Sequence, residues 1–318
     1  MHEDDPQEAG PQEAGPQEAG PQEAGPQEAG LHEAGRPGGL APGLYLVATP
    51  IGAARDVTLR ALDILAAADV LAAEDTRSLR RLMEIHGVRR AGRPIVAYHD
   101  HNAARQIPRL LADLADGRSV ALVSDAGTPL IADPGYRLVA EATAAGLPVR
   151  AAPGASALLA AVAVAGLPTD RFLFAGFLPP KAGARTRALG ELAAVPASLV
   201  FYESPRRLAE SIAAMAETLG AERPAAVCRE LTKRFEEVRR DSLAALAAHY
   251  ADAGAPKGEV VVVVGPPQAA AVTADTLDAA LADALATQSV REAAAAVARD
   301  LDLPRREVYA RALELAGR

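Results

Sequence analysis

The sequence predicts an α/β protein whose two main domains are built on parallel or mixed sheets covered by helices. Short apolar runs alternate with helical segments of ten or more residues between residues 43 and 267, which is typical of strands joined by covering helices. The length of 318 residues allows two domains and a small third one. Half of the residues are apolar, so a large core can form.

Residues 1–42 are predicted to be a disordered tail. Residues 6–30 are five copies of Pro-Gln-Glu-Ala-Gly, and a decayed sixth copy follows at 31–35. Proline and glycine in every repeat oppose a helix, and the segment has few large apolar side chains to offset the entropy of ordering. It also lacks the basic and apolar regions of a secretion signal. Two interpretations of the repeat stay open, an interaction arm and a repeat expansion without function, and the second is favoured.

A first α/β domain is predicted over residues 43–153. It starts with a buried strand at 44–48, which ends in the loop Thr49-Pro50-Ile51-Gly52, and a helical pattern follows from Leu59. The remaining strands are expected at 70–73, 95–99, 120–124 and 149–152, and helices at 102–115 and 136–145.

A second α/β domain is predicted over residues 154–267, and a small helical domain over 274–318. Strands of the second domain are expected at 172–177, 198–202, 226–229 and 260–264, and helices at 155–165, 206–219 and 242–251. The pair Pro266-Pro267 ends the last strand. Beyond a polar linker, helices are expected at 277–286, 290–300 and 305–316.

Composition and charge exclude several classes of protein. Apolar stretches are short and interrupted by Asp, Arg or Gly, so no membrane span is expected. Cys228 is the only cysteine, which excludes an intramolecular disulfide and a cysteine-based metal site and is typical of a reducing cytosol. Nine of the 41 acidic residues lie within 1–35, which leaves 33 basic and 32 acidic side chains in the rest. This near-neutral body does not repel nucleic acid, but it does not predict binding to DNA either. The helical domain has eight acidic residues and six arginines, which is not typical of a DNA-binding domain.

Three loops rich in glycine and proline follow predicted strands, at 49–52, 124–135 and 152–157. Ligands of α/β proteins bind at the carboxyl ends of strands, so three such loops in one domain indicate a binding site there. The sequence has no P-loop, no Gly-x-Gly-x-x-Gly after the first strand and no Gly-x-Ser-x-Gly elbow. No metal site is expected at His99-Asp100-His101, because in an extended strand Asp100 would point away from both histidines.

Arginines and carboxylates occur together after three strands, in the segments 74–77, 202–207 and 229–234. These positions suit phosphate-binding arginines and acid/base carboxylates, although each segment alone is explained equally well by solvated ion pairs. Lys181, Arg185 and Arg187 occupy a segment interrupted by proline and glycine. A mobile basic loop that contacts an RNA backbone is predicted there, and an ordinary surface loop fits nearly as well.

Together these motifs resemble those of the ribosomal small-subunit RNA (cytidine-2′-O)-methyltransferases of the tetrapyrrole-methylase superfamily. The resemblance covers about residues 43–265, and the helical domain resembles the small helix-turn-helix-like domain of the same enzymes. The repeat tail has no counterpart. The motifs that carry the resemblance are 44–52, 56–61, 73–77, 124–135, 153–157, 176–179, 201–206 and 229–233.

The resemblance implies a two-domain class III methyltransferase fold with S-adenosyl-L-methionine in the cleft between the α/β domains. It also implies a cytoplasmic homodimer that methylates the ribose 2′-hydroxyl of a decoding-centre cytidine in 16S ribosomal RNA of the small subunit. Carried over motif by motif, the cofactor would contact Pro50, Asp125, Gly127, Thr128, Pro129, Ile131, Ser156, Ala157 and Tyr202.

A 2′-hydroxyl is a poor nucleophile near neutral pH, so a positioned base should assist an in-line methyl transfer. Glu74 is the predicted base, and Asp75, Glu203 and Glu230 are further candidates. Arg77 and Lys233 are predicted to complete the catalytic set by positioning charge. The predicted RNA contacts are Lys181, Arg185, Arg187 and Arg206. Two alternatives remain, a methylase of corrin or porphyrin precursors and a ribosome-assembly binder without enzymatic activity.

Overall fold

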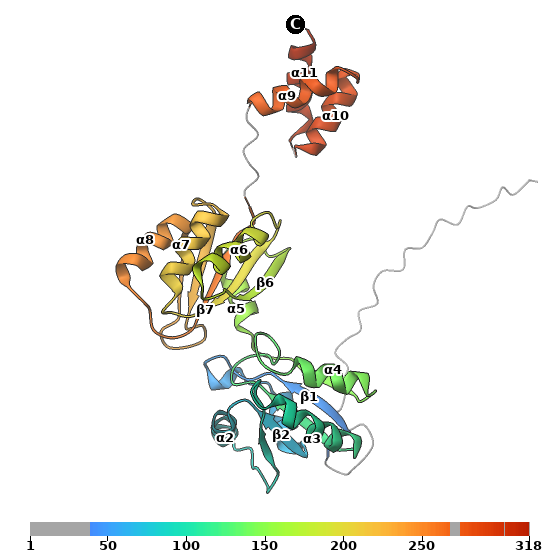
Figure 1. The fold of residues 1–318 in the computed structure, drawn as a ribbon, viewed down its shortest axis with the longest axis vertical. Helices are drawn as coiled ribbons and strands as arrows, with labels where there is room; N and C mark the ends of the chain where they lie inside the picture. The colour runs from blue at the N-terminus through green and yellow to red at the C-terminus, as the bar shows by residue number, and fades with distance from the viewer. Residues whose placement is uncertain (1–38, 268–273, 302, 318) are drawn as a thin grey trace, which may run out of the picture.

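The computed structural model describes residues 39–267, 274–301 and 303–317. The predicted disorder of the repeat tail therefore falls outside the described residues, apart from its last four positions. The first strand begins at Gly43, and two α/β sheets and a separate group of three helices follow along the chain (Figure 1).

The first sheet is entirely parallel and has the strand order β3-β2-β4-β1-β5. Helices cover both of its faces, so β2 and β4 are buried along their whole length and consist almost only of small and branched apolar residues. The strands are β1 (Gly43–Val47), β2 (Val70–Ala73), β3 (Ile95–Ala97), β4 (Ser119–Val123) and β5 (Val149–Ala152). The helices are η1 (Ala54–Asp56), α1 (Leu59–Ala67), α2 (Thr76–Ile85), α3 (Ala103–Ala115) and α4 (Tyr136–Ala144).

The order of this sheet creates a switch point between the neighbouring strands β1 and β4. From β1 the chain crosses to β2 on one side of the sheet, whereas from β4 it crosses to β5 on the other side. The loops that leave the carboxyl ends of two such strands diverge and open a crevice, where ligands of α/β proteins bind. The loops in question are 48–53 and 124–135.

The second sheet is mixed and has the order β6-β7-β10-β8-β9. Only β6 and β7 pair in parallel, and the other three pairings are antiparallel. The strands are β6 (Phe172–Phe177), β7 (Ser198–Glu203), β8 (Pro224–Arg229), β9 (Glu237–Ser242) and β10 (Val260–Val264). The helices are α5 (Ala157–Ala165), α6 (Ala182–Leu192), α7 (Leu208–Leu219) and α8 (Leu243–Ala253).

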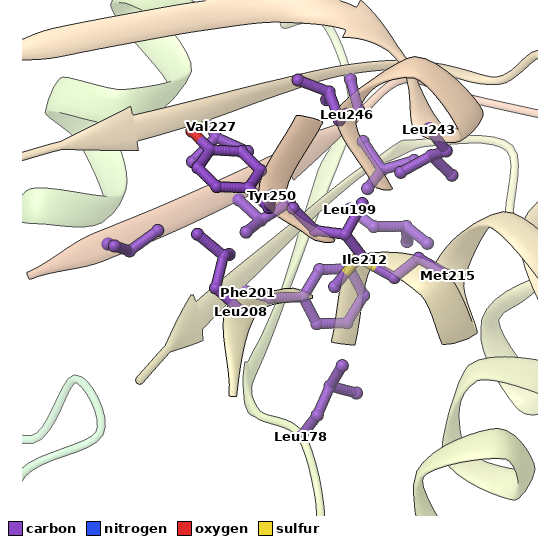
Figure 2. Packing of buried hydrophobic residues seen from close by; sticks show 14 of the residues in the cluster. Leu178, Leu199, Phe201, Leu208, Ile212, Met215, Val227, Leu243, Leu246 and Tyr250 are labelled. Carbon is purple, nitrogen blue, oxygen red and sulfur yellow. The ribbon is translucent and has the colours of Figure 1, made fainter. Parts of the chain in front are cut away.

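Two cores hold the second sheet between its helices. On one face, side chains of α7 and α8 pack with those of β7 and β8, and Phe201, Ile212 and Met215 are fully buried there (Figure 2). On the other face, α5 packs on β7, β8 and β10 through a cluster that includes Ala161 and Val263. Burial of this cluster anchors the N-terminus of α5, which belongs to the site described below.

The third unit consists of α9 (Ala274–Leu285), α10 (Val290–Asp300) and α11 (Arg305–Ala316). It has a core of its own around Leu281, Val297 and Val308. A capping box between Ser289 and Glu292 begins α10, which satisfies two backbone N–H groups that the helix leaves free. None of the helices in the described ranges is long and apolar enough to span a membrane.

The structure differs from the sequence prediction at three segments, the first of which is the helix α2, where no helix was named. The mobile basic loop predicted around residues 181–187 is wrong, because residues 182–192 form the helix α6, whose residues Arg185 and Leu189 are buried one turn apart. The strand β9 was not predicted because its sequence Glu-Val-Arg-Arg-Asp-Ser has one apolar residue, Val238, and is otherwise polar. It lies at the edge of the sheet, where charged side chains remain in water and protect the edge from further pairing.

Candidate functional site

A cavity of about 370 Å³ lies between the two α/β domains. We call it the interdomain cavity. The first domain contributes the loop that follows β4, and the second contributes the end of β7, the start of α5 and the start of β10. Its lining residues are Ile51, Asp125, Ala126, Gly127, Thr128, Ile131, Ala132, Asp133, Ala157, Phe177, Tyr202, Glu203, Ser204, Pro205, Gly258, Glu259, Val260 and Val261.

The residues predicted to bind a cofactor gather at this cavity. Six of the nine line it directly, and two more, Pro129 and Ser156, are buried in the loops that form its wall. Pro50 instead lines a neighbouring cavity of about 200 Å³ against α2, which we call the α2 cavity. The predicted residues that line the interdomain cavity are Asp125, Gly127, Thr128, Ile131, Ala157 and Tyr202.

Backbone and hydroxyl hydrogen bonds join the three glycine-rich loops. Thr49 and Gly127 exchange two backbone hydrogen bonds of 2.9 and 3.0 Å, and the Ser124 hydroxyl donates to the Gly127 carbonyl at 2.8 Å. The Thr128 hydroxyl donates to the carbonyl of Ala155 at 3.0 Å. The loops after β1, β4 and β5 therefore form one rigid wall.

The loop after β4 contains residues in an unfavourable backbone conformation. Leu130 and Ala132 have φ values of +72° and +63°, in the left-handed region that residues with a Cβ adopt at a cost. Ile131 and Asp133, which follow them directly, both line the interdomain cavity. Such conformations persist where the surrounding structure holds them, and they concentrate at functional sites.

Tyr202 connects β7 to α5 within the second domain. Its hydroxyl accepts a hydrogen bond of 3.1 Å from the backbone N–H of Leu158 in the first turn of α5. Its ring contacts Phe174 and Phe177 edge to face, with centroid distances of 4.8 and 5.7 Å. Desolvation by burial raises the pKa of Tyr202, so the hydroxyl remains neutral at physiological pH and fixes the helix end at the cavity.

Three carboxylates give this region a negative charge. Asp133 is desolvated and lies near Glu74 and Asp125, which raises its pKa to about 6. Desolvation also raises the pKa of Glu74, and the charges of Asp125 and Asp100 add to the effect against the opposing influence of His99. Glu74 lines neither cavity. Asp133 belongs to a predicted loop but was not singled out, because its exposure to the cavity depends on the strained turn and not on its spacing in the sequence.

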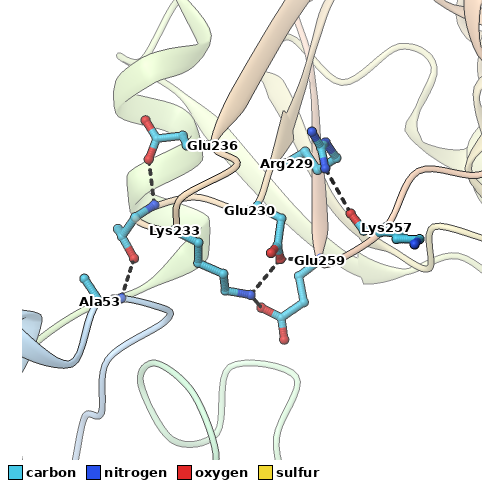
Figure 3. A network of polar contacts seen from close by, with 8 residues as sticks. Ala53, Arg229, Glu230, Lys233, Glu236, Lys257 and Glu259 are labelled. Atoms are coloured by element: carbon cyan, nitrogen blue, oxygen red, sulfur yellow. Dashed lines mark hydrogen bonds and ion pairs between the residues drawn. The ribbon is translucent and has the colours of Figure 1, made fainter.

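The other predicted catalytic groups are engaged in ion pairs. Arg77 donates to both oxygens of Asp75 from an exposed position, and these bonds lower the pKa of Asp75 to about 2. Lys233 donates to Glu230 at 2.7 Å and to Glu259 at 2.9 Å (Figure 3). Because Glu259 lines the interdomain cavity, Lys233 stands at its rim and not inside it.

The loop around Lys233 also contacts the first domain. The hydroxyl of Thr232 accepts a hydrogen bond of 3.1 Å from the backbone N–H of Ala53 (Figure 3). Glu230 and Thr232 have φ values of +50° and +65°. This strained loop thus links the second domain to the loop that leaves β1.

Two carboxylates considered as bases are occupied elsewhere. Glu203 is fully buried, and its oxygens accept from Arg207 at 2.6 Å, from the hydroxyl of Ser211 at 2.6 Å and from the backbone of Ser204 at 2.7 Å. Its role in the structure is to hold the start of α7. The hydrogen bond from Lys233 lowers the pKa of Glu230, which makes it a weaker proton acceptor.

The predicted RNA contacts are separated by burial. Lys181, Arg187 and Arg206 are exposed. The side chain of Arg185 is only 7% exposed and donates to Glu210 at 3.4 Å. A guanidinium on the buried face of α6 does not reach an RNA backbone, so Arg185 is removed from the set of RNA contacts.

The histidines considered for a metal site lie in a turn, because β3 ends at Ala97. The rings of His99 and His101 have centroids 6.0 Å apart. Among the residues with described positions, no three His, Cys, Asp or Glu side chains are grouped so that they could hold a metal ion.

Comparisons with known proteins agree with this architecture. Residues 43–247 match the family model described as Tetrapyrrole (Corrin/Porphyrin) Methylases, and residues 268–316 match the model described as RsmI C-terminal HTH domain. The chain is 55% identical over 276 residues to "Ribosomal RNA small subunit methyltransferase I" of Mesorhizobium japonicum, covering 87% of this chain and 93% of the relative. It is 42% identical over 280 residues to the protein of the same name from Pseudomonas aeruginosa, covering 86% and 98%.

Solved structures show the same fold at low sequence identity. The crystal structure of the methyltransferase CobJ has a TM-score of 0.55 and 21% identity, covering 71% of this chain and 94% of that one. The crystal structure of diphthine synthase has a TM-score of 0.55 and 18% identity, covering 70% and 89%.

Proposed function

Since the chain belongs to the tetrapyrrole methylase family and is a methyltransferase, we propose that it uses S-adenosyl-L-methionine to methylate the ribose 2′-hydroxyl of a decoding-centre cytidine in 16S ribosomal RNA. One observation carries the proposal. Six of the residues predicted to hold the cofactor line the interdomain cavity, at the switch point of the parallel sheet.

The chemistry of the interdomain cavity fits this cofactor. Asp125 and Asp133 provide negative charge for a ligand with a sulfonium and an amino group. Apolar contacts come from Ile131, Ala157 and Tyr202. Gly127 lets the backbone come close, because a Cβ at this position would lie 3.3 Å from Ile51 and its φ is +84°. The bound cofactor supplies an electrophilic methyl group.

Glu74 is the proposed proton acceptor for the 2′-hydroxyl. Desolvation and the charges of Asp125 and Asp100 raise its pKa, which makes it a stronger base than an ordinary carboxylate. Arg77 and Lys233 are proposed to position charged groups at the two edges of the site. Their ion pairs with Asp75 and Glu259 must open or be shared when an RNA phosphate binds.

Ribosomal RNA is favoured over a tetrapyrrole as the methyl acceptor. Relatives named as ribosomal RNA small subunit methyltransferases align along both α/β domains and into the helical unit. The tetrapyrrole-modifying neighbours share the fold at 23% identity or less. Exposed Lys181, Arg187 and Arg206 offer phosphate contacts. The assembled small subunit is the proposed substrate, because RNA is read largely through its shape and its splayed single strands.

We also propose that the protein acts in the cytoplasm as a homodimer. The substrate defines the compartment, and the resemblance to the family suggests the dimer. Light scattering of the purified chain tests the oligomeric state, since a mass near 66 kDa is expected from a chain of 32.8 kDa and a mass near that of one chain would contradict the proposal.

The proposed function is tested with labelled S-adenosyl-L-methionine and three acceptors in parallel. These are purified small ribosomal subunits, naked 16S RNA and a tetrapyrrole precursor. Label in the subunit RNA supports the proposal. Label only in the tetrapyrrole favours that alternative, and binding to subunits without any transfer favours an assembly factor.

A further inference from the structure

The α2 cavity is a second concave site, distinct from the interdomain cavity that six of the predicted cofactor residues line. Its volume is about 200 Å³, and it lies between the loop after β1, the helix α2 and the end of β4. Its lining residues are Thr49, Pro50, Gly52, Ala54, Ser78, Leu79, Arg81, Leu82, Ile85, Val123, Ser124 and Asp125.

One face of α2 forms a wall of this cavity. Ser78, Arg81, Leu82 and Ile85 follow the spacing i, i+3, i+4 and i+7, which places them on one side of a helix. This side of α2 also carries apolar surface that other elements leave uncovered, since Ile85 is 54% exposed. This wall combines apolar surface with a single cation.

That cation, Arg81, has no partner among the residues that the structure describes. Arg81 forms no hydrogen bond or ion pair with any residue in the described parts of the chain, whereas Arg77, one turn earlier, is paired with Asp75. An unpaired guanidinium at the mouth of a cavity suits a phosphate, which it binds through charge-assisted and often bidentate hydrogen bonds.

The α2 cavity adjoins the interdomain cavity. Asp125 lines both of them, and the loop after β1 separates them, with Ile51 on the interdomain side and Pro50 and Gly52 on the α2 side. A ligand in the α2 cavity therefore has one end next to Asp125, where it meets the cofactor cavity.

We infer that the α2 cavity binds the acceptor nucleotide itself, turned out of the RNA, with its base against Leu82 and Ile85 and its phosphate on Arg81. This inference rests on the proposed function. Sequence-specific RNA recognition targets nucleotides whose bases are splayed out of the stack and held by protein side chains, as enzymes that act on a base do when they extrude it into a pocket. The ribose then lies at the junction beside Asp125, within reach of a methyl group held in the interdomain cavity.

The test uses two variants on the lining face of α2 and two controls on its other exposed face. Ser78→Trp fills the α2 cavity and Arg81→Ala removes the cation. Glu84→Trp and Arg80→Ala make matched changes at exposed positions of the same helix that line neither cavity. All four positions are exposed, so the variants are expected to fold, which circular dichroism verifies.

Two quantities are measured in the full-length protein, the affinity for S-adenosyl-L-methionine by calorimetry and the kinetics of methyl transfer to small ribosomal subunits. Arg81→Ala is expected to raise KM for subunits about tenfold, and Ser78→Trp to lower kcat/KM by more than that. Both should keep the cofactor affinity of the controls.

Other outcomes overturn the inference in distinguishable ways. Kinetics equal to those of the controls would place the acceptor outside the α2 cavity while leaving the proposed function intact. A loss of cofactor affinity in Ser78→Trp would show that the cofactor itself occupies this space. Absence of transfer to subunits by the unmodified protein would reject the proposed function together with the inference.

Discussion

At the scale of single residues, the carboxyl of Asp133 decreases stability at neutral pH. Its pKa rises from an ordinary value of 3.8 to about 6 on folding, so the unfolded chain releases this proton first as the pH increases. Stability is therefore lost between about pH 4 and pH 6, and the cost is complete above that window. A charge kept at this cost in a cavity wall is consistent with binding of a cation.

Replacing Asp133 by Asn should raise the melting temperature at pH 7.5 and leave it unchanged at pH 4, because only the ionised form is penalised. Thermal unfolding followed by circular dichroism at pH 4, 5.5 and 7.5 measures this. Asp252→Asn, at an exposed position of α8, is the control and should show no such trend. A lower melting temperature of Asp133→Asn at pH 7.5 would mean that the carboxylate makes a stabilising contact.

Replacing Glu74 by Gln should lower kcat about 100-fold, the usual contribution of a general base. Cofactor affinity should change little, because Glu74 does not line the interdomain cavity. In the unmodified protein kcat should increase with pH through the raised pKa of Glu74, and this increase should be lost in the variant. Glu84→Gln on the outer face of α2 is the control. Full activity of Glu74→Gln would assign the proton to another group.

Residue identity predicted the position of the glycine-rich loops better than the engagement of the charged groups. Gly127, Thr128 and Ile131 could be named from a motif whose backbone conformation depends on local sequence. The burial of Arg185 and the engagement of Glu203 could not. Arg185 is buried because α6 packs beside α7, where it meets Glu210, and Glu203 is engaged because the start of α7 folds back onto the end of β7.

At the scale of elements, the hydrogen bond between Tyr202 at the end of β7 and Leu158 at the start of α5 fixes one wall of the interdomain cavity. Helix N-termini have free N–H groups that need partners. Here Ser156, the N-cap residue of α5, makes no side-chain capping bond. The tyrosine hydroxyl supplies one missing acceptor.

Tyr202→Phe should therefore reduce the free energy of unfolding by about 1 kcal/mol and weaken cofactor affinity severalfold. Chemical denaturation and calorimetry measure the two effects. Tyr309→Phe is the control, because Tyr309 lies on α11 with its side chain partly in solvent. Unchanged affinity with reduced stability would show that the bond supports the fold but does not shape the cavity.

Elements with a clear apolar period were predicted to within a few residues, as for β2, β5 and α10. The failures have a physical cause. The helix α6 has Gly183 near its start, a residue of low helix propensity, yet Leu189 buries completely and the helix forms. The strand β9 is polar because it is an edge strand, so its pairing with β8 is determined by tertiary context.

At the scale of the whole molecule, the site is built from two α/β domains that meet through apolar packing of Ile51 and Ile131 and through the hydrogen bond between Ala53 and Thr232. All residues that line the interdomain cavity fall between Ile51 and Val261, and the helical unit has its own core. Arg311 pairs with Asp278 within this unit at 2.6 Å. The interdomain cavity and the helical unit are thus separate parts of the structure.

A chain that ends at residue 267 should consequently bind S-adenosyl-L-methionine with the affinity of the full chain. Its KM for small subunits should rise if the helical unit docks on the particle, whereas its oligomeric state should change if the unit packs in a dimer. Calorimetry, transfer kinetics and light scattering on both chains distinguish these roles. Loss of cofactor affinity in the shortened chain would contradict the separation of the two parts.

The most direct test of the central claim is the chemical identity of the methylated product. Small subunits are incubated with the protein and S-adenosyl-L-methionine, the 16S RNA is digested to nucleosides, and the products are identified by mass spectrometry against unreacted subunits. The account predicts a gain of 2′-O-methylcytidine from one decoding-centre position. A methyl group on a base, or on the ribose of another nucleoside, would contradict it.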